Sequence, residues 1–328
     1  MSPQADILIV TVTPVESCAV LQAFPQATGR KPELLSIRDR VYFNLGSLNG
    51  ARIFHTQCEM GTSGPDASLL AIQKGIDALT PLAVIMVGIA FGINPEKQTI
   101  GDILVSQQLR PYDLQRHGTI QDGQPKISLR SDKPHASPWL LNHLKSTHLL
   151  WQAPPKVRFG VVLTGEKLVD NLNLRQHLLD LEPEAIGGEM EGTGLYTACQ
   201  DKKVDWILVK GICDWADGHK AEDKDNRQHT AAQNATQFVI AALQLAPLDW
   251  QSQRLPSLPT NPAPASPPAV TPDPAVLQPA LDMAQRSLAF LEQQAAGYTS
   301  LTIPTHLQLA LEDKRQEVAE LEARLQEK

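Results

Sequence analysis

Residues 182–217 read EPEAIGGEMEGTGLYTACQDKKVDWILVKGICDWAD, and this stretch decides the fold. It begins with a predicted turn at residues 186–188 and continues into a predicted helix over residues 192–199. An apolar run at residues 206–209 then predicts a strand. This order of turn, helix and strand indicates an α/β sheet.

Two acidic residues of this stretch lie just past predicted strand ends. Glu191 stands where a strand passes into the helix, and Asp214 follows the apolar strand. Ligands of open α/β sheets bind outside the carboxyl ends of the strands. We therefore expect Glu191 and Asp214 to act together on one ligand.

The rest of residues 1–248 continues the α/β pattern and forms the predicted catalytic domain. Apolar runs predict buried strands at residues 6–12, 82–87, 103–106 and 157–164. Asn49-Gly50 predicts a hairpin that joins strands at residues 40–48 and 51–58. Helices are predicted at residues 18–24, 69–79, 138–148, 174–181 and 228–245. Residues 110–155 otherwise read as a long loop.

The chain changes character after residue 248. Residues 249–274 are rich in proline, which predicts an extended linker without a core. Residues 275–328 predict an αα-hairpin of two amphipathic helices. The apolar seams are Leu277, Leu281, Ala284, Leu288 and Leu291 in the first helix, and Leu307, Leu311, Val318, Leu321 and Leu325 in the second. Two such helices have only marginal stability on their own, so we expect an interaction module that pairs with a second copy or with a protein partner. Packing on their own core domain is the alternative.

Composition and charge argue against several function classes. The 328-residue chain has a net charge of −7, without the basic excess of a protein that binds nucleic acid or an anionic membrane. Its four cysteines are scattered without a metal-binding pattern, which predicts reduced thiols and no metal. The apolar run at the start is too short for a signal peptide or a membrane span. These features predict a cytoplasmic protein.

Two further segments carry candidate site residues. Glu16 lies in the predicted first turn of a helix, where its charge suits the helix dipole, so a structural role is the alternative there. The glycine-rich turn at residues 59–68 includes Gly61 and opens the next helix. Such a turn presents free backbone N–H groups to an anion or a sugar hydroxyl.

Several segments resemble the nucleoside phosphorylase superfamily, and most of all its methylthioadenosine/adenosylhomocysteine nucleosidase branch. They are VTPVES at 12–17, VGIAFGI at 87–93 with GDILVS at 101–106, GGEMEGTG at 187–194 and KGICDWAD at 210–217. The resemblance covers about residues 6–245. It implies a three-layer α/β/α fold around a central mixed, twisted sheet, and hydrolysis of a purine N-glycosidic bond without a cofactor.

The resemblance also implies residue roles. Asp214 matches the acid that protonates purine N7, and Glu16 matches the carboxylate that positions or deprotonates water. Glu191 matches the residue that holds the ribose hydroxyls, and Met190 the one packed beneath the sugar. Further substrate contacts are implied for Glu189, Val169, Leu168, Ala90, Gly88 and Gly61.

Three departures from the family pattern bear on the reaction. Phosphorylases of the superfamily commonly have an arginine where this chain has Met86, and a hydroxyl residue where it has Ile89. Phosphate would be poorly held without those donors, so water is the expected nucleophile and phosphorolysis the alternative. Cys213 replaces the serine that usually precedes the acid, which leaves the orientation of Asp214 open.

The group on the ribose 5′ carbon stays open at this stage. Lys167 and Lys210 fall in predicted loops near the site and could contact a 5′-phosphate, although both could equally be surface lysines. The fused helical pair resembles adaptor regions of bacterial signalling and conflict proteins, which implies an effector role in antiviral defence. A nucleotide-sensing adaptor without turnover is the alternative. Because family members form dimers or larger rings, we expect a homo-oligomer.

Overall fold

The chain divides into two compact units, residues 1–256 and 257–328, and each is described by itself. The computed structural model describes residues 4–119, 125–151, 154–245, 274–296 and 305–326. The predicted proline-rich linker at residues 249–274 lies outside these ranges, except for its last residue, which begins a helix.

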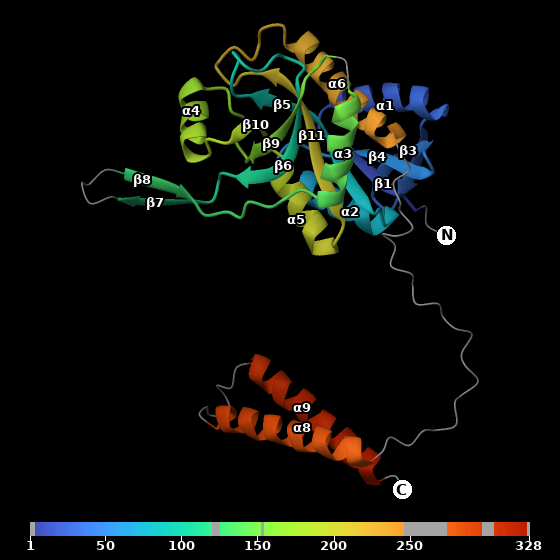
Figure 1. Ribbon diagram of the computed structural model, residues 1–328, viewed down its shortest axis with the longest axis vertical. Coiled ribbons are helices and arrows are strands. Elements are labelled where there is room, and N and C mark those ends of the chain that lie inside the picture. The colour runs from blue at the N-terminus through green and yellow to red at the C-terminus, as the bar shows by residue number, and fades with distance from the viewer. Residues whose placement is uncertain (1–3, 120–124, 152–153, 246–273, 297–304, 327–328) are drawn as a thin grey trace. The chain divides into compact units, whose positions relative to one another are not determined.

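A nine-stranded mixed sheet with the strand order β10-β9-β6-β11-β5-β1-β4-β3-β2 forms the first unit (Figure 1). Its strands are β1 (Ile7–Thr11), β2 (Glu33–Ile37), β3 (Arg40–Leu48), β4 (Ala51–Gln57), β5 (Ala83–Gly92), β6 (Ile103–Pro111), β9 (Val157–Thr164), β10 (Ala185–Glu189) and β11 (Asp205–Asp214). In its centre β1 and β11 both pair parallel with β5. The carboxyl ends of these three strands therefore meet at one edge of the sheet.

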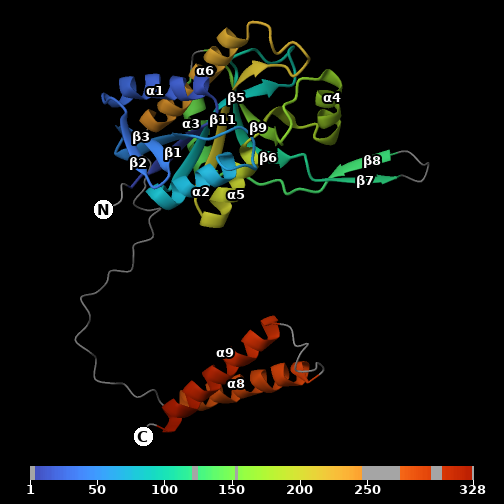
Figure 2. The same ribbon diagram turned by 180° about the vertical axis from the view of Figure 1, so that it is seen from behind.

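Helices cover both faces of the sheet, so the predicted three-layer α/β/α fold is confirmed (Figures 1 and 2). The helices of one layer are α1 (Pro14–Thr28), α3 (Pro138–Leu150) and α6 (Lys224–Leu245). Those of the other are α2 (Ser68–Leu79) and α5 (Gly192–Lys202), while α4 (Leu172–Leu181) lies near the β10 edge. No helix among the described residues is long and apolar enough to cross a bilayer.

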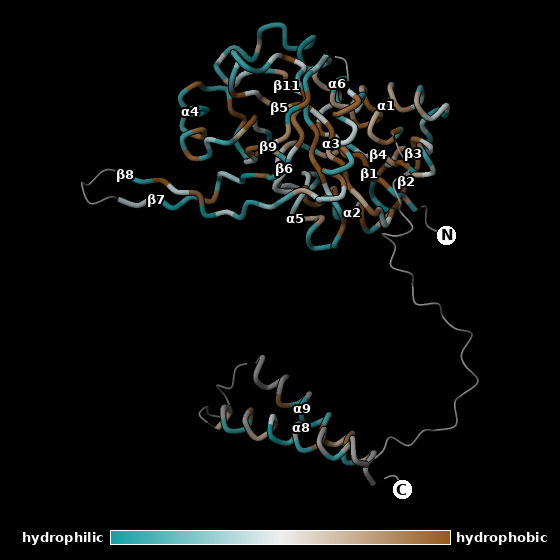
Figure 3. Tube along the Cα trace, viewed as in Figure 1, coloured by the Kyte–Doolittle hydropathy of each residue, from teal (hydrophilic) through white to brown (hydrophobic). Residues whose placement is uncertain are grey.

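The central strands are buried because they are apolar on both faces. All five residues of β1 are buried, and nine of the ten residues of β11 are buried. Figure 3 shows hydrophobic residues concentrated along these strands and polar ones in the outer loops. Burial on both sides produces the continuous Val, Ile and Leu runs of the sequence.

Residues 186–188 form part of strand β10, so the predicted turn is wrong. Gly187 and Gly188 pair antiparallel with Gly92 and Phe91 of β5. A Cβ atom on Gly187 would lie 2.3 Å from a methyl of Leu104 and 2.6 Å from the carbonyl oxygen of Phe91. The two glycines therefore allow β10 to cross β5 at close range, and this places residues 189–191 at the site.

The predicted long loop at residues 110–155 is also wrong in part. It contains a two-stranded hairpin of β7 (Gln115–Thr119) and β8 (Pro125–Leu129), which projects from the sheet in both views (Figures 1 and 2). β7 has no buried residue, so its sequence lacks the apolar alternation that would predict a strand.

The second unit is the predicted αα-hairpin of α8 (Pro274–Ala295) and α9 (Thr305–Gln326). Leu281 and Ala284 of α8 and Val318 of α9 are buried together, with Leu288 and Leu321 packed against them. These contacts confirm the middle of the two predicted seams. The side chains of Leu277, Leu307 and Leu325 lie outside the described residues.

Candidate active site

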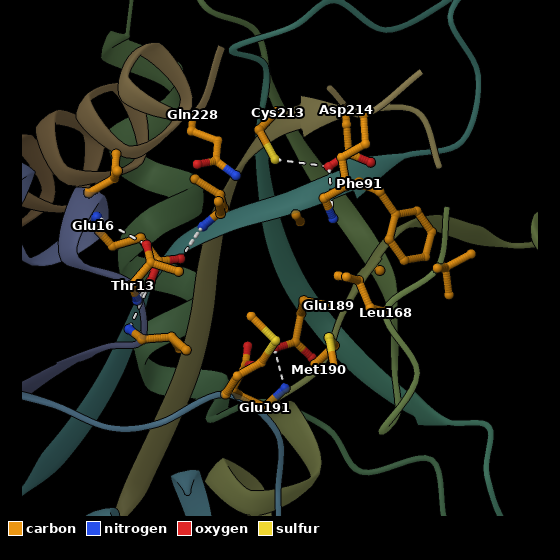
Figure 4. A pocket seen from close by; sticks show the side chains of 18 of the residues that line it. Thr13, Glu16, Phe91, Leu168, Glu189, Met190, Glu191, Cys213, Asp214 and Gln228 are labelled. Atoms are coloured by element: carbon orange, nitrogen blue, oxygen red, sulfur yellow. Dashed lines mark hydrogen bonds and ion pairs between the residues drawn. The ribbon is translucent and has the colours of Figure 1, made fainter. Parts of the chain in front are cut away.

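A cavity of about 390 Å³ opens at the edge of the sheet where β1, β5 and β11 end. Its wall contains four carboxylates: Glu16, Glu189, Glu191 and Asp214. In Figure 4, Glu16 lies on one side, Asp214 on another, and Glu189 and Glu191 below them. The tertiary structure thus brings the predicted acids, which come from distant parts of the chain, to one small cavity.

Glu16 is held as a carboxylate by backbone donors on both of its oxygens. Its Oε2 accepts hydrogen bonds from the N–H groups of Val12 and Thr13, both at 2.7 Å. Its Oε1 accepts one from Ile89 N–H, also at 2.7 Å. Thr13 caps the α1 N-terminus with Glu16 as its capping-box partner, so local sequence sets the position of this side chain. The three backbone donors fix the position of the Glu16 carboxyl group.

Gly88 provides the space that Glu16 occupies. A Cβ atom at this position would lie 2.0 Å from Glu16 Oε1 and 3.0 Å from Lys210 Nζ. Gly88 is not among the residues that line the cavity, and its lack of a side chain admits the Glu16 carboxylate. Its predicted substrate contact stays a prediction. Ala90, two residues later in β5, does line the cavity.

Glu191 is a buried carboxylate with one partner on each oxygen. Its Oε1 accepts a hydrogen bond from Gly61 N–H at 3.0 Å, and its Oε2 lies 3.4 Å from Lys210 Nζ. Burial raises the pKa of Glu191, while Lys210 and the Gly61 N–H oppose that shift. Gly61 was predicted to present a free N–H to the substrate; the N–H binds Glu191 instead, and Gly61 does not line the cavity.

Lys210 lies inside strand β11, so its predicted loop position is wrong. Its side chain is 0% exposed, and Nζ lies 3.4 Å from Glu191, 3.8 Å from Glu16 and 3.9 Å from Glu189. Burial opposes its charge, but these carboxylates outweigh burial and hold the pKa of Lys210 above its ordinary value. A side chain so enclosed does not reach a 5′-phosphate.

Glu189 serves the start of helix α5. Its carboxylate accepts hydrogen bonds from the backbone N–H groups of Glu191 and Gly192, at 2.9 to 3.0 Å. Negative charge at a helix N-terminus is favourable, and the donors would otherwise be unpaired. The side chain lines the cavity and also fixes the backbone that carries Glu191, while its predicted substrate contact stays a prediction.

Asp214 ends strand β11 and is oriented by three neighbours. Its Oδ1 accepts a hydrogen bond from Ala216 N–H at 3.0 Å. Its Oδ2 lies 3.2 Å from the Cys213 thiol and 3.5 Å from Lys220 Nζ. Burial and the adjacent carboxylate raise the pKa of Cys213, so the thiol stays protonated and donates to Asp214. The Cys213 thiol therefore makes a hydrogen bond to Asp214 at the position where the family usually has a serine.

Apolar side chains form a slot beside Asp214. Phe91 and the predicted Leu168 and Val169 line it, and Figure 4 shows Phe91 and Leu168 on the Asp214 side of the cavity. Met190 lines the cavity beside Glu189 and Glu191. Val169 is 2% exposed, whereas Leu168 is 58% exposed at the cavity mouth. A slot with apolar walls and one acid fits a flat heterocyclic base.

Three polar residues of the wall were not predicted. Lys220 precedes helix α6, and Lys224 and Gln228 lie on its first turns. The sequence predicts a charged loop over residues 218–227, so it did not place Lys220 and Lys224 at the cavity. The four-residue spacing of Lys224 and Gln228 is the signal that could have indicated a shared helix face. Lys167 lines the cavity from the loop after β9, as predicted, with Nζ 2.9 Å from Asp113.

The sequence of the first unit matches a known protein family. The family described as the Phosphorylase superfamily matches residues 6–244. A death domain-containing ATP nucleosidase of Amphimedon queenslandica is 26% identical over 253 residues, which cover 71% of this chain and 47% of that protein. The chain thus spans about half of that relative. A 5′-methylthioadenosine/S-adenosylhomocysteine nucleosidase of Staphylococcus epidermidis is 29% identical over 184 residues, covering 54% of this chain and 75% of that one.

Solved structures share the fold. Futalosine hydrolase of Helicobacter pylori has a TM-score of 0.61 and 21% identity, covering 75% of this chain and 99% of that chain. The 5′-methylthioadenosine/S-adenosylhomocysteine nucleosidase of Neisseria meningitidis, in complex with methylthio-immucillin-A, has a TM-score of 0.60 and 16% identity, with coverages of 73% and 98%.

Proposed function

The chain belongs to the phosphorylase superfamily, and on this premise we propose that it hydrolyses the N-glycosidic bond of a purine nucleoside or nucleotide. One observation carries the proposal: Glu16, Glu191 and Asp214 face a single cavity from three sides (Figure 4). The relatives named as nucleosidases support it.

Each carboxylate suits one part of the reaction. As the bond between C1′ and N9 breaks, its electron pair moves to the base, and Asp214 donates a proton to N7 of the departing purine. Glu191 accepts hydrogen bonds from the ribose hydroxyls beside the oxocarbenium-like carbon. Water adds to C1′ and loses its proton to Glu16. The products are the free purine and the ribosyl hydrolysis product.

Water is the proposed nucleophile because the wall offers no arginine for phosphate among the described residues. Met86 is 0% exposed inside β5, and Ile89 contributes its N–H to Glu16. A phosphate dianion at that position would also meet the charge of Glu16.

The test is a panel of adenosine, methylthioadenosine, AMP and ATP, incubated with and without phosphate and analysed by chromatography for free base. We expect base release without phosphate, and a loss of about 100-fold or more in kcat for Asp214→Asn, in which the proton donor is removed. Release that requires phosphate would support phosphorolysis. Binding of a nucleotide whose glycosidic bond stays intact would support the sensing adaptor.

The wider role remains a prediction. We propose that residues 275–328 form an interaction module, that the protein is a cytoplasmic homo-oligomer, and that its activity serves a signalling or defence system. The small apolar contact between α8 and α9 supports the first of these, since so small a helical pair gains by further pairing. Light scattering of the full chain, compared with a chain ending at residue 248, tests the contribution of the module to assembly.

A further inference from the structure

The cavity has a cationic side that the proposed chemistry does not use. Its wall carries Lys167, Lys220 and Lys224 in addition to the carboxylates. Lys167 is paired with Asp113 at 2.9 Å, and Lys220 lies 3.5 Å from Asp214. Lys224 has no ion pair with any residue that the structure describes, and its side chain is exposed. One ammonium group at the cavity is therefore available to a ligand.

Helix α6 presents this charge together with a polar amide. Lys224 is the first residue of α6, and Gln228 lies one turn later on the same helix face. Both line the cavity, and among the described residues Gln228 makes no hydrogen bond through its side chain. The N-terminus of α6 adds its positive dipole to the Lys224 charge.

The position of this group relative to the base slot indicates which part of a substrate it meets. Figure 4 shows Gln228 beside Glu16 and Thr13, on the side of the cavity away from Phe91 and Leu168. A ribose held by Glu191, with its base in the slot, directs its 5′ carbon away from that slot. The α6 side is then the wall that faces the 5′ substituent.

Charge decides which substituent suits that wall. Glu16, Glu189 and Glu191 surround Lys210, so the cavity floor already carries more negative than positive charge. An anionic 5′ group needs cations of its own to enter such a site. An ammonium and an amide suit a phosphate, whereas a thioether would gain nothing from them.

We propose that Lys224, with the amide of Gln228, binds the 5′-phosphate of the substrate, so that the substrates are purine nucleoside 5′-phosphates. This inference rests on the proposed function and names its substrate class. It also replaces Lys210, which is enclosed by carboxylates, with two residues of α6.

Turnover of matched substrates tests the assignment. kcat/KM is measured for adenosine, methylthioadenosine, AMP and ATP with the wild type, Lys224→Gln and the control Lys145→Gln. Lys145 is an exposed lysine of α3 outside the cavity wall, so its variant makes the same charge change elsewhere. We expect the wild type to prefer the nucleotides, and Lys224→Gln to reduce the ratio of nucleotide to nucleoside kcat/KM by about tenfold or more. Lys145→Gln should keep the wild-type ratio.

Two outcomes would overturn the inference while leaving the proposed function intact. One is wild-type turnover of adenosine or methylthioadenosine that equals or exceeds that of AMP and ATP. The other is an unchanged ratio in Lys224→Gln.

If no substrate releases a purine, the proposed function fails, and calorimetry then decides the phosphate site separately. Tighter binding of AMP than of adenosine, lost in Lys224→Gln, would support the site. Equal binding of the two ligands would exclude it.

Discussion

The ammonium of Lys210 lies 3.4 Å from Oε2 of Glu191, and the lysine side chain is 0% exposed. The carboxylate proposed to hold the ribose is therefore supported from behind by a strand residue. The same ammonium lies 3.8 Å from Glu16, so one buried cation serves carboxylates from two distant segments.

Replacing Lys210 should show how much the stability of the protein depends on this buried cation. Lys210→Met leaves buried carboxylates without their cation, and we expect a loss of about 3–5 kcal/mol in the free energy of unfolding. Chemical denaturation measures it, with the exposed Lys145→Met as the control. A loss no larger than that of the control would show that the carboxylates do not need this charge.

The Cys213 thiol should be replaceable by a hydroxyl but not by a methyl group. Cys213→Ser keeps a donor to Asp214 Oδ2, whereas Cys213→Ala removes it. We expect near wild-type kcat for the serine variant and a decrease of about tenfold for the alanine variant. Both should unfold at similar temperatures. Equal kcat in the two variants would contradict a role of the thiol in orienting the acid.

Gly88 should tolerate no side chain. In Gly88→Ala the new Cβ would collide with Glu16 Oε1, which must then give up the Ile89 N–H. We expect a decrease in kcat of about 100-fold, the scale of a lost general base. The matched control is Gly118→Ala in β7, where the nearest neighbour of the new Cβ lies 3.7 Å away. Activity of the Gly88 variant at the control level would argue against Glu16 as the base.

His55 should make the protein acid-sensitive. Burial lowers the pKa of His55 from 6.5 to about 3, and its Nε2 lies 2.8 Å from Thr11 Oγ1. Below pH 6.5 the unfolded chain binds a proton at His55 that the folded chain refuses until about pH 3. The free energy of unfolding should therefore fall as the pH falls through this window, by at most about 1.4 kcal/mol per pH unit from this group.

Denaturation at several pH values checks this slope. His55→Gln should flatten it, and His117→Gln, at an exposed position of β7, should leave it unchanged. An identical slope in wild type and His55→Gln would assign the acid sensitivity to other groups.

Most strands of the central sheet, most helices and the four acids could be predicted because they depend on local pattern, whereas β2 (Glu33–Ile37) was not predicted. Buried strands such as β1 are continuous apolar runs. Glu16 belongs to a capping box that spans only four consecutive residues, Thr13 to Glu16. The β7–β8 hairpin escaped prediction because β7 is polar throughout and has no buried residue. Lys210 was assigned to a loop because a charged residue inside a buried strand contradicts the hydrophobic pattern, and only its carboxylate neighbours make that burial favourable.

The sequence by itself determined the α/β class, the motifs around Glu191 and Asp214, and the terminal helical pair, since each depends on residues close together in the chain. Only the tertiary structure decided which groups face the ligand. It turned the Gly61 and Gly88 positions toward Glu191 and Glu16, enclosed Lys210, and brought Lys224 to the cavity. The physical reason is that contacts between distant segments depend on how strands pair and helices pack, and no local pattern records these.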